Sequence, residues 1–499
     1  MSEPRPVAVI VLAAGEGTRM KSRIPKVLHP LCGRSMLGHA LAAAGDLAPE
    51  RLAVVVGHSR DEVSAEAERY APGVQVVVQD RPGGTGHAVR TVSEALGDLA
   101  GIVVVTYGDM PLLRAQTLAA LVREHATAGN AVTVLTALVA DPAGYGRVIR
   151  DGSGALAEIV EDADATAAQR AISEINSGCY AFDGALLADA VKRVATSNAQ
   201  GQEYLTDVVA ILRGDGHLAG TVLAGDPAEI QGVNDQVQLA QVRRAFNGRL
   251  LEDWMRAGAT IMDPASTWID VDVTLAPDAT ILPGTHLEGR TDIGAGARIG
   301  PGCVLRDTSV GPDAMLLYTV CESAEVGPGA TIGPFARLRP GTRISAGAHI
   351  GTFVELKNSR VGEGAKVPHL SYVGDADIGE RANIGAATIF ANYDGVAKHH
   401  TTVGAHVFTG SDTVLVAPVT IGDGAYTAAG SVVTEDVPPG AIAVARGRQH
   451  NAPGWVERKR PGTGSAAAAA QARKTEDWEA SAKETSAGEA AEGGEGTQA

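Results

Sequence analysis

An aliphatic residue recurs at every sixth position through most of the second half of the chain, and this period restricts the fold more than any other feature. A six-residue repeat with one inward aliphatic side chain predicts a parallel β-helix, because each repeat buries that side chain only by stacking on its neighbours. Breaks in the register predict loops that leave the coil, among them the polar segment 391–402. The main positions in the period are Leu275, Ile281, Leu287, Ile293, Ile299 and Leu305, then Val326, Ile332, Leu338, Ile344, Ile350 and Leu356, and later Val403, Thr409, Leu415, Ile421, Thr427 and Val433.

The first half of the chain alternates short apolar runs with helical patterns such as Leu118–His125. The runs are continuous in apolar residues, as expected for strands that are buried on both faces of a parallel sheet. Alternating strands and helices predict a doubly wound α/β domain, whose ligands bind at the carboxyl ends of the strands. The runs are Val7–Leu12, Leu52–Val56, Val74–Val78, Ile102–Thr106 and Val132–Leu138.

These patterns divide the chain into four predicted parts: an α/β domain (1–235), a linker helix (236–258), a β-helix domain (259–460) and a disordered tail (461–499). The tail is rich in Ala, Glu, Gly, Ser and Thr, and such a segment buries too little apolar surface to offset the entropy lost on ordering. The linker is predicted as an amphipathic helix because its large apolar residues recur at intervals of three and four. Those residues are Leu239, Val242, Phe246, Leu250 and Trp254.

The formal net charge of −16 argues against nucleic acid or an anionic membrane as a partner, because both attract positively charged proteins. The apolar run Val7–Ala14 is too short to span a bilayer, and no other segment reaches the ~18 consecutive apolar residues of a membrane helix. The four cysteines form no CxxC pair, which is typical of reduced thiols in a cytosolic protein. We therefore expect a cytoplasmic protein that binds neither membranes nor nucleic acids.

A glycine-rich segment, Leu12–Met20, directly follows the first predicted strand. It lacks the GxxxxGK[ST] pattern of a Walker loop, and Met20 stands where a dinucleotide-binding fingerprint requires its third glycine. A triphosphate-binding loop of another kind and a plain strand-to-helix turn remain as alternatives. Basic residues gathered nearby, including Arg19 and Lys26, favour the triphosphate loop in so acidic a chain.

Four segments in this order resemble the signature of sugar-nucleotide pyrophosphorylases: LAAGEGTRM with Pro25–Leu28, Gln79 with Gly84–Ala88, Tyr107–Asp109, and Gly232–Asn234. The ordered set resembles the family of bifunctional N-acetylglucosamine-1-phosphate uridylyltransferases and glucosamine-1-phosphate acetyltransferases, from about Val7 to Arg460. The resemblance implies acetyl transfer from acetyl-CoA to glucosamine 1-phosphate. Uridylyl transfer from UTP then releases pyrophosphate and gives UDP-N-acetylglucosamine, a cell-wall precursor.

The resemblance implies roles for individual residues of the first site. Arg19 and Lys26 bind the phosphates and act in catalysis, while Asp109 and Asn234 hold Mg²⁺, a hard cation that prefers oxygen ligands. Such a reaction depends on aligning two phosphates and offsetting negative charge. The residues implied to bind UTP or UDP-N-acetylglucosamine are Leu12, Ala13, Ala14, Gly15, Lys26, Gln79, Gly84, Thr85, Tyr107, Gly108, Asp109, Gly146, Glu161, Asn176 and Asn234.

Three segments of the coil, Phe335–Pro340, Phe353–Lys357 and His369–Tyr372, resemble the acetyl-acceptor site of the same family. His369 is implied to be the proton acceptor, since the imidazole of histidine accepts a proton near neutral pH. The implied acceptor-binding residues are Arg339, Lys357, Tyr372 and Asn383. The implied acetyl-CoA residues are Ala386, Asn392, Tyr393, Ser411, Ala429 and Arg446, and Lys398 is a further candidate for CoA or sugar contact.

The family's coil is left-handed and its members are homotrimers, so the resemblance implies both properties here. Ala387 departs from the pattern, which often has glycine there, and its methyl group is expected to narrow the acyl-CoA groove. Two other functions stay open: a single-activity pyrophosphorylase with a regulatory β-helix, and a non-catalytic β-helix scaffold. The basic residues around His369 argue against the first, and the triphosphate loop with Asp109 argues against the second.

Overall fold

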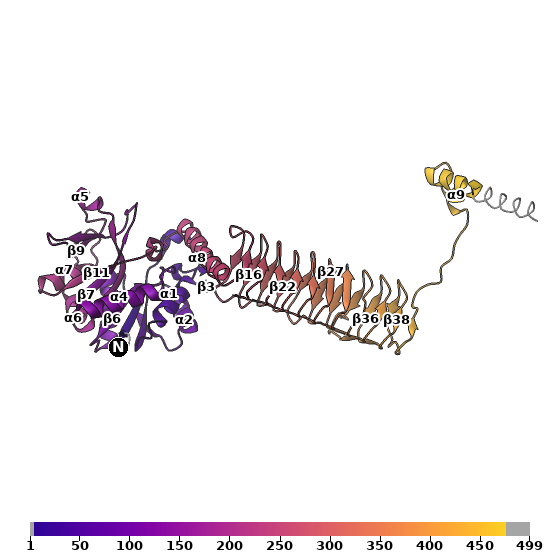
Figure 1. Ribbon diagram of the computed structural model, residues 1–499, viewed down its shortest axis with the longest axis horizontal. Coiled ribbons are helices and arrows are strands. Elements are labelled where there is room, and N and C mark those ends of the chain that lie inside the picture. The colour runs from indigo at the N-terminus through magenta and orange to yellow at the C-terminus, as the bar shows by residue number, and fades with distance from the viewer. Residues whose placement is uncertain (1–3, 476–499) are drawn as a thin grey trace, which may run out of the picture. The chain divides into compact units, whose positions relative to one another are not determined.

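The computed structural model describes residues 4–475, and its first half contains a nine-stranded sheet (Figure 1). The main path through the sheet runs β11-β7-β10-β6-β1-β4-β5, and β8 and β9 extend it beside β10. The strands are β1 (Ala8–Leu12), β4 (Arg51–Val56), β5 (Gln75–Val78), β6 (Ile102–Tyr107), β7 (Val132–Leu138), β8 (Arg147–Arg150), β9 (Leu156–Val160), β10 (Glu174–Asp183) and β11 (Ala219–Leu223). A separate two-stranded hairpin joins β2 (Pro30–Leu31) to β3 (Arg34–Ser35).

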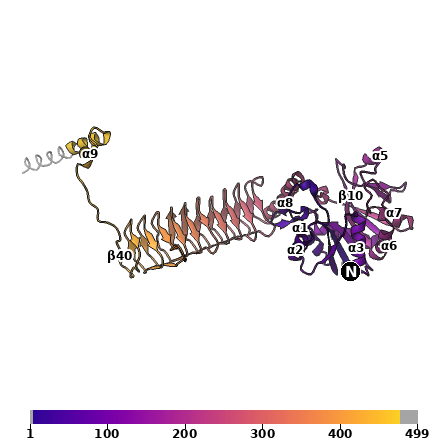
Figure 2. The same ribbon diagram turned by 180° about the vertical axis from the view of Figure 1, so that it is seen from behind.

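Helices pack on both faces of this sheet, as the alternating pattern predicted (Figures 1 and 2). Side chains from α3, α6 and α7 share a core with Ile10 of β1, while α1, α2 and α4 share a second core with Val9 and Val11. The fold is therefore doubly wound. The helices are α1 (Met36–Gly45), α2 (Arg60–Tyr70), α3 (Thr85–Leu96), α4 (Ala115–Ala128), α5 (Ala167–Arg170), α6 (Gly184–Ala190) and α7 (Asp207–Gly214).

All five predicted strands are present, but the sheet is mixed rather than purely parallel. The long strand β10 lies between β6 and β7 and runs antiparallel to both. The expectation of burial on both faces is wrong for β5, where Val76 and Val78 are 38% and 43% exposed. The reason is position: β5 is the last strand of the path, so it lacks a neighbour on one side.

A single helix, α8 (Gln236–Arg256), leads from this domain to the coil. The side chain of Asp235 caps its first turn by accepting a hydrogen bond from the Gln238 N–H (2.8 Å). Near its start Leu239 and Val242 belong to a small core of the first domain, and near its end Leu251 belongs to the core of the coil. The helix therefore contributes apolar side chains to both regions.

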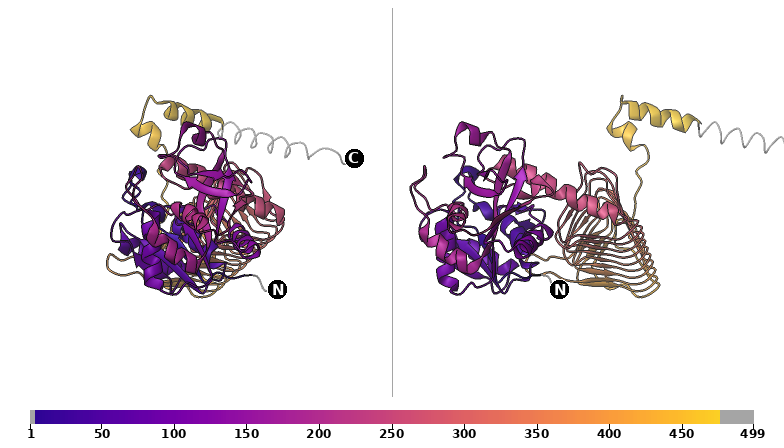
Figure 3. Two further views of the ribbon diagram at one scale, coloured as in Figure 1. Left: turned by 90° about the vertical axis from the view of Figure 1, so that its left-hand side faces the viewer. Right: turned by 60° about the vertical axis from the view of Figure 1, so that its left-hand side comes forward.

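The second half winds into a parallel β-helix with flat faces (Figure 3). One sheet holds β12 (Thr260–Ile261), β15 (Thr280–Ile281), β18 (Arg298–Ile299), β21 (Met315–Leu316), β24 (Thr331–Ile332), β27 (His349–Thr352) and β30 (Lys366–His369). A separate three-stranded sheet follows later in the chain and holds β35 (Phe408–Thr409), β38 (Tyr426–Thr427) and β40 (Ile442–Ala443). A second long sheet holds β13 (Trp268–Ile269), β16 (His286–Glu288), β19 (Val304–Arg306), β22 (Val320–Glu322), β25 (Arg337–Leu338), β28 (Glu355–Lys357), β31 (Tyr372–Gly374), β33 (Ile389–Ala391), β36 (Val414–Val416) and β39 (Val432–Val433). A third long sheet holds β14 (Thr274–Leu275), β17 (Asp292–Ile293), β20 (Ser309–Val310), β23 (Glu325–Val326), β26 (Arg343–Ile344), β29 (Arg360–Val361), β32 (Ala376–Ile378), β34 (Thr401–Val403) and β37 (Val419–Ile421).

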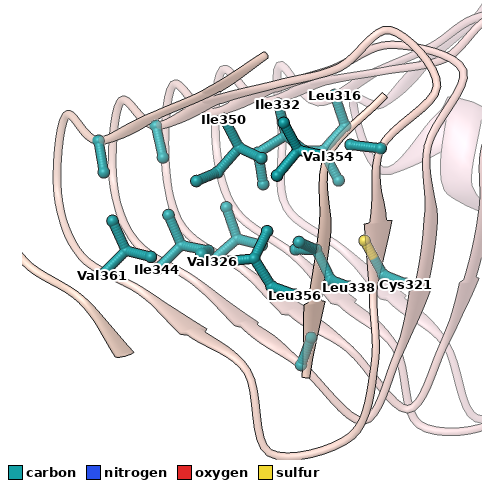
Figure 4. Close-up of a cluster of buried hydrophobic side chains, with 14 of the residues drawn as sticks. Leu316, Cys321, Val326, Ile332, Leu338, Ile344, Ile350, Val354, Leu356 and Val361 are labelled. Carbon is teal, nitrogen blue, oxygen red and sulfur yellow. The ribbon is translucent and has the colours of Figure 1, made fainter. Parts of the chain in front are cut away.

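The aliphatic residue of each hexad points into the coil, where it lies on the equivalent residue of the turn before (Figure 4). Leu338, for example, is fully buried and pairs in register with Cys321 on one side and Leu356 on the other. The predicted period of six is confirmed, and the coil is consistent with the left-handed form that the resemblance implied. Such stacked rows make a narrow core in which each turn supports its two neighbours.

Within the described residues, 444–475 form a separate compact unit. It contains α9 (Trp455–Lys459), and residues 464–475 are also helical. This differs from the disorder expected for 461–499, and the run of alanines at 466–470 gives a physical reason, because Ala has the highest helix propensity. The remainder of that prediction, 476–499, lies outside the described residues. No helix within residues 4–475 is long and apolar enough to cross a membrane.

Candidate active sites

The loop that follows β1 folds tightly against the segment that carries Lys26. Gly17, in this loop, has a φ of +64°, a left-handed conformation that glycine adopts without strain. A β-carbon at Gly17 would clash with the side chain of Lys26. Glycine at this position therefore lets the loop and Lys26 approach each other closely.

The ammonium group of Lys26 is the centre of a polar cluster. It forms an ion pair with the carboxylate of Asp109 and donates a hydrogen bond to Asn234 Oδ1 (2.9 Å). Arg19 Nη2 donates to the same amide oxygen at 2.8 Å. Asp109 follows β6 and Asn234 precedes α8, so the cluster gathers residues from three distant segments, 19–26, 109 and 234, at the carboxyl ends of β1 and β6.

A cavity of about 450 Å³ opens beside this cluster. Gly108, Gly146 and Asn234 do not line it directly. The Gly108 N–H donates to the Leu12 carbonyl (2.9 Å), and the Gly146 carbonyl accepts from the Asn176 N–H (2.8 Å). The Asn234 side chain accepts a hydrogen bond from Lys26. The predicted binding residues that do line it are Leu12, Ala13, Ala14, Gly15, Lys26, Gln79, Gly84, Thr85, Tyr107, Asp109, Glu161 and Asn176.

The amide of Gln79 is already engaged within the protein. Its Nε2 lies 3.0 Å from the Gly84 carbonyl oxygen and 3.0 Å from His87 Nδ1. The sequence suggested that Gln79 pairs with a base edge through both its N–H and its C=O. In this structure the Nε2 group makes both of these contacts, so pairing with a base through the N–H requires one of them to break.

Glu161 lines the cavity on the side of β9 and α7. Burial raises the pKa of its carboxyl, and a hydrogen bond from Thr206 Oγ1 (3.2 Å) acts in the opposite direction. Burial also raises the pKa of Tyr107, which lies on the cavity wall at the end of β6. Neutral hydroxyl groups beside a carboxyl form a lining that suits the hydroxyls of a sugar.

Sequence reasoning missed several residues of the cavity wall. Thr206 holds Glu161, and Tyr204 precedes it in the segment that leads into α7. This segment follows no strand end and carries no motif, so its only signal is a cluster of polar and aromatic residues between two elements. The missed lining residues are Glu16, Val27, Pro82, Ala88, Tyr180, Gln200, Gln202, Tyr204 and Thr206.

The second cluster lies on successive turns of the coil. His369 ends β30 and Tyr372 begins β31, with the exposed Leu370 between them. The His369 carbonyl accepts hydrogen bonds from Ser371 Oγ (2.8 Å) and the Ala387 N–H (3.1 Å), while the side chain is exposed. The backbone at His369 is therefore fixed and its imidazole faces outward.

Positive charge gathers on the neighbouring turns. Arg339 Nη1 donates to Glu355 Oε1 at 3.0 Å, and Lys357 pairs with Asp375 at 3.3 Å. A hydrogen bond with Lys398 raises the pKa of Lys357, and the contacts with Asp375 act in the same direction. The bond to Lys357 lowers the pKa of Lys398. Lys398, from the loop 391–402, thus lies near Lys357 on the coil.

The loop 391–402 is held by its own polar side chains. Asp394 accepts a hydrogen bond or ion pair from His399 Nε2 (2.7 Å), and the Tyr393 hydroxyl donates to the Gly395 carbonyl (2.7 Å). Hydrogen bonds from backbone N–H groups and from His399 lower the pKa of Asp394. Asn392, the only buried residue among 391–400, reaches back to Asp375 at 2.5 Å.

Three of the implied acetyl-CoA residues, Ala386, Ser411 and Ala429, follow one corner of the coil. The Ala386 carbonyl accepts from the Asp412 N–H (2.7 Å), and the Ser411 carbonyl accepts from the Gly430 N–H (2.8 Å), so Ala386, Ser411 and Ala429 belong to consecutive turns. Asn383 bridges the coil through its backbone, donating to the Val407 carbonyl (2.8 Å). Arg446 lies in the separate C-terminal unit.

Ala387 occupies the same corner with a φ of +57°, a conformation in which a β-carbon is strained. Its side chain is half-buried. Alanine at this position therefore strains the backbone where glycine would not, and the expected effect on the acyl-CoA groove stays a prediction.

Comparison with known proteins matches both halves. The model of a MobA-like NTP transferase domain matches residues 9–175, and that of the bacterial transferase hexapeptide (six repeats) matches residues 400–435. The chain is 60% identical over 483 residues to a protein of Thermobifida fusca named Bifunctional protein GlmU, which covers 96% of this chain and all of the relative. Proteins of the same name from Streptomyces coelicolor and Mycobacterium bovis are 59% identical (96% of this chain, 100% of the relative) and 54% identical (95% of this chain, 96% of the relative).

Proposed function

The chain belongs to the family of bifunctional GlmU proteins, and from this membership and the two clusters we propose that it makes UDP-N-acetylglucosamine at two separate sites. It is a bifunctional transferase: a uridylyltransferase in the α/β domain and an acetyltransferase in the coil. Its substrates are sugar phosphates, UTP and acetyl-CoA, and its product serves cell-wall synthesis. The observation that carries the proposal is the presence of two independent cationic clusters, around Lys26 and around Lys357, each beside groups suited to one of the reactions.

At the first site, Lys26 and Arg19 offset the negative charge that accumulates when a sugar phosphate attacks the α-phosphate of UTP. The nucleophile is already an anion, so alignment and charge compensation supply most of the catalysis. The Gly-rich loop after β1 brings backbone N–H groups close to the phosphates. We assign the uridine to the side of Gln79 and Thr85 and the sugar to the side of Glu161 and Asn176.

A divalent cation is required for this transfer, and we propose Mg²⁺. The Asp109 carboxylate and the Asn234 amide oxygen converge on a single cation in the structure, the ammonium of Lys26. Both are hard oxygen ligands of the kind that Mg²⁺ takes beside water and phosphate oxygens. The donor set therefore fits, and when bound the metal would neutralise phosphate charge. No group of three or more His, Cys, Asp or Glu side chains within residues 4–475 could hold a metal.

At the second site, Arg339 and Lys357 bind the phosphate of glucosamine 1-phosphate, Tyr372 and Asn383 place the sugar, and Lys398 contacts the sugar or CoA. His369 accepts a proton from the amine as its nitrogen attacks the thioester carbon of acetyl-CoA. The C–N bond forms, the C–S bond breaks, and the imidazolium returns the proton to the CoA sulfur. The exposed imidazole on a fixed backbone suits this exchange.

We propose a cytoplasmic homotrimer assembled along the coil. Tyr318, Phe335, Phe353 and Leu370 occupy one corner on successive turns and are 45%, 54%, 57% and 59% exposed. The three aromatic rings stack with centroids 5.4 Å apart at each step. A continuous exposed apolar ladder commonly marks a protein interface. Leu370 directly follows His369, so subunit contact along this ladder would lie beside the acetyl-transfer site.

A coupled assay tests the proposed function. Purified protein is given Mg²⁺, UTP, acetyl-CoA and glucosamine 1-phosphate, and free CoA and pyrophosphate are followed separately. We expect both products, with pyrophosphate dependent on acetyl-CoA. Pyrophosphate formed from N-acetylglucosamine 1-phosphate without any release of CoA would leave a single-activity enzyme with a regulatory coil.

Single substitutions separate the two sites. His369→Ala is expected to abolish CoA release and spare pyrophosphate release from N-acetylglucosamine 1-phosphate, and Asp109→Ala is expected to do the reverse. The proteins are compared at matched oligomeric state by light scattering. Loss of both activities from either variant in a folded assembly would contradict independent sites.

A further inference from the structure

The carboxylate of Asp375 joins residues that the proposed function places on different substrates. Asp375 lies at the turn between β31 and β32 and its side chain is 13% exposed. Its Oδ2 lies 3.3 Å from Lys357 Nζ and accepts a hydrogen bond from Asn392 Nδ2 at 2.5 Å. Its Oδ1 accepts from Asn358 Nδ2 at 2.8 Å. One carboxylate therefore contacts both the implied phosphate ligand Lys357 and the implied acetyl-CoA ligand Asn392.

The backbone of Asp375 strengthens the same connection. Its N–H donates to the Lys357 carbonyl (3.0 Å), and its carbonyl accepts from the Thr401 N–H (3.1 Å). Thr401 begins β34, where the loop 391–402 returns to the coil. Asp375 thus ties the turn that carries Lys357 to the end of the loop that carries Asn392.

The preceding glycine leaves the space that this arrangement needs. A β-carbon on Gly374 would lie 2.5 Å from the Tyr372 hydroxyl and 2.6 Å from Asn392 Nδ2. The Tyr372 hydroxyl and the Asn392 amide therefore both lie over Gly374, next to Asp375. Acceptor-site and donor-site groups meet at this one point of the coil.

We propose that Asp375 is a positioning residue for acetyl transfer, which holds Lys357 and Asn392 at a fixed separation. The sugar phosphate and acetyl-CoA are then bound with the amine close to the thioester carbon. The proposal rests on the acetyltransferase function proposed above. Asp375 touches neither reacting atom and acts through its two partners. Small misplacements of reacting groups reduce reaction rates strongly. One residue that fixes the ligands of both substrates therefore raises the rate of acetyl transfer.

The charge on Asp375 is the property that matters. Burial opposes ionisation, but hydrogen bonds from Asn358, Asn392 and Lys357 outweigh it and lower the pKa of the Asp375 carboxyl. An anion at this point counteracts the mutual repulsion of Lys357 and Lys398, because the neighbouring Lys357 lowers the pKa of Lys398 and Asp375 acts in the opposite direction. Removing that charge should therefore displace Lys357 even if the side chain keeps its shape.

The isosteric variant Asp375→Asn tests the proposal in the full-length protein. We expect the KM for glucosamine 1-phosphate and the KM for acetyl-CoA each to rise about 10-fold or more, with pyrophosphate release from N-acetylglucosamine 1-phosphate unchanged. Asp377→Asn is the matched control, because Asp377 lies two residues further on and pairs with the exposed His400 at 3.2 Å. Both KM values of Asp375→Asn staying within twofold of the parent would overturn the proposal.

A cross-effect gives a second, independent measurement. Asn392→Ala removes one holder of Asp375, so the KM for glucosamine 1-phosphate, measured at saturating acetyl-CoA, is expected to rise several-fold although Asn392 is assigned to acetyl-CoA alone. An unchanged acceptor KM would overturn the link through Asp375. Absence of CoA release from the parent protein itself would instead reject the proposed acetyltransferase, so the two failures are distinguishable.

Discussion

The two halves of the molecule build a site in opposite ways. In the α/β domain, Arg19, Lys26, Asp109 and Asn234 come from segments far apart in the chain and meet because β1 and β6 are neighbours in the sheet. In the coil, Arg339 and Lys357 stand at equivalent places one turn apart, because Leu338 and Leu356 pair in register. A sheet with crossovers thus assembles a site by topology, and a solenoid assembles one by repetition.

This difference also governs how a site fails. A coil residue is supported by the turns directly above and below it, so damage to one turn spreads along the stack. The residues around Lys26 are supported by cores that pack on both faces of one sheet. We expect substitutions in the two regions to leave the activity of the other region largely intact.

Lys26→Met is expected to have the largest effect. It removes the cation that holds Asp109 and Asn234 together while keeping most of the side-chain volume. Loss of one such charge-stabilising group commonly lowers kcat by about 10²–10³-fold. Pyrophosphate release is the measurement, and CoA release serves as the internal control. A parallel fall in CoA release would show that the two halves are not independent.

Leu338→Ala tests how much the stacked aliphatic core of the coil contributes to stability. Leu338 is fully buried between Cys321 and Leu356, and truncating a buried leucine to alanine typically destabilises a protein by about 2–5 kcal/mol. We expect acetyl transfer to be lost at a lower temperature than uridylyl transfer when residual activities are measured after heating. The matched variant Leu135→Ala, fully buried in β7 of the α/β domain, should give the reverse order.

Mild acid should weaken the α/β domain through His39. Burial lowers the pKa of His39 to about 4, so between pH 6.5 and 4 the unfolded chain binds a proton that the folded chain does not. The unfolding free energy therefore falls as the pH falls through this window, by up to about 3 kcal/mol. Hydrogen exchange at pH 5 and 7 over the segment around His39 measures this. His39→Gln should flatten the dependence, and an equally steep loss in that variant would assign it to other groups.

Ala387→Gly is expected to have the smallest effect, and a favourable one. The residue has a φ of +57°, where alanine is strained by about 1 kcal/mol relative to glycine. The variant should unfold at slightly higher urea concentration, and its KM for acetyl-CoA should fall or stay equal. Ala382→Gly, at a buried position outside the left-handed region, is the control and should lose stability.

Much of the fold could be predicted because its signals are local. The six-residue period located the inward side chains of the coil, and every predicted position of the main runs is buried. The five apolar runs became β1, β4, β5, β6 and β7. The insertion of the antiparallel β10 between β6 and β7 could not be seen, because strand order depends on pairing between distant segments.

The candidate sites were predicted only as far as motifs and resemblance reach. The sequence named the residues near each site, but it did not reveal that Gln79 is engaged by Gly84 and His87, or that the segment before α7 lines the cavity. It gave no sign of the helix at 464–475 beyond alanine content. These features follow from loop paths and from contacts between side chains, which no local pattern encodes.

The sequence by itself determined the coil, the doubly wound domain and the residue types available for both reactions, because hydrophobic periodicity acts at each position separately. Only the tertiary structure decided which of those side chains meet. The convergence of Asp109 and Asn234 on Lys26, and of Lys357 and Asn392 on Asp375, depends on the order of strands and the path of one loop. The local pattern predicts whether one residue is buried, whereas a site requires several residues to lie within contact distance of one another.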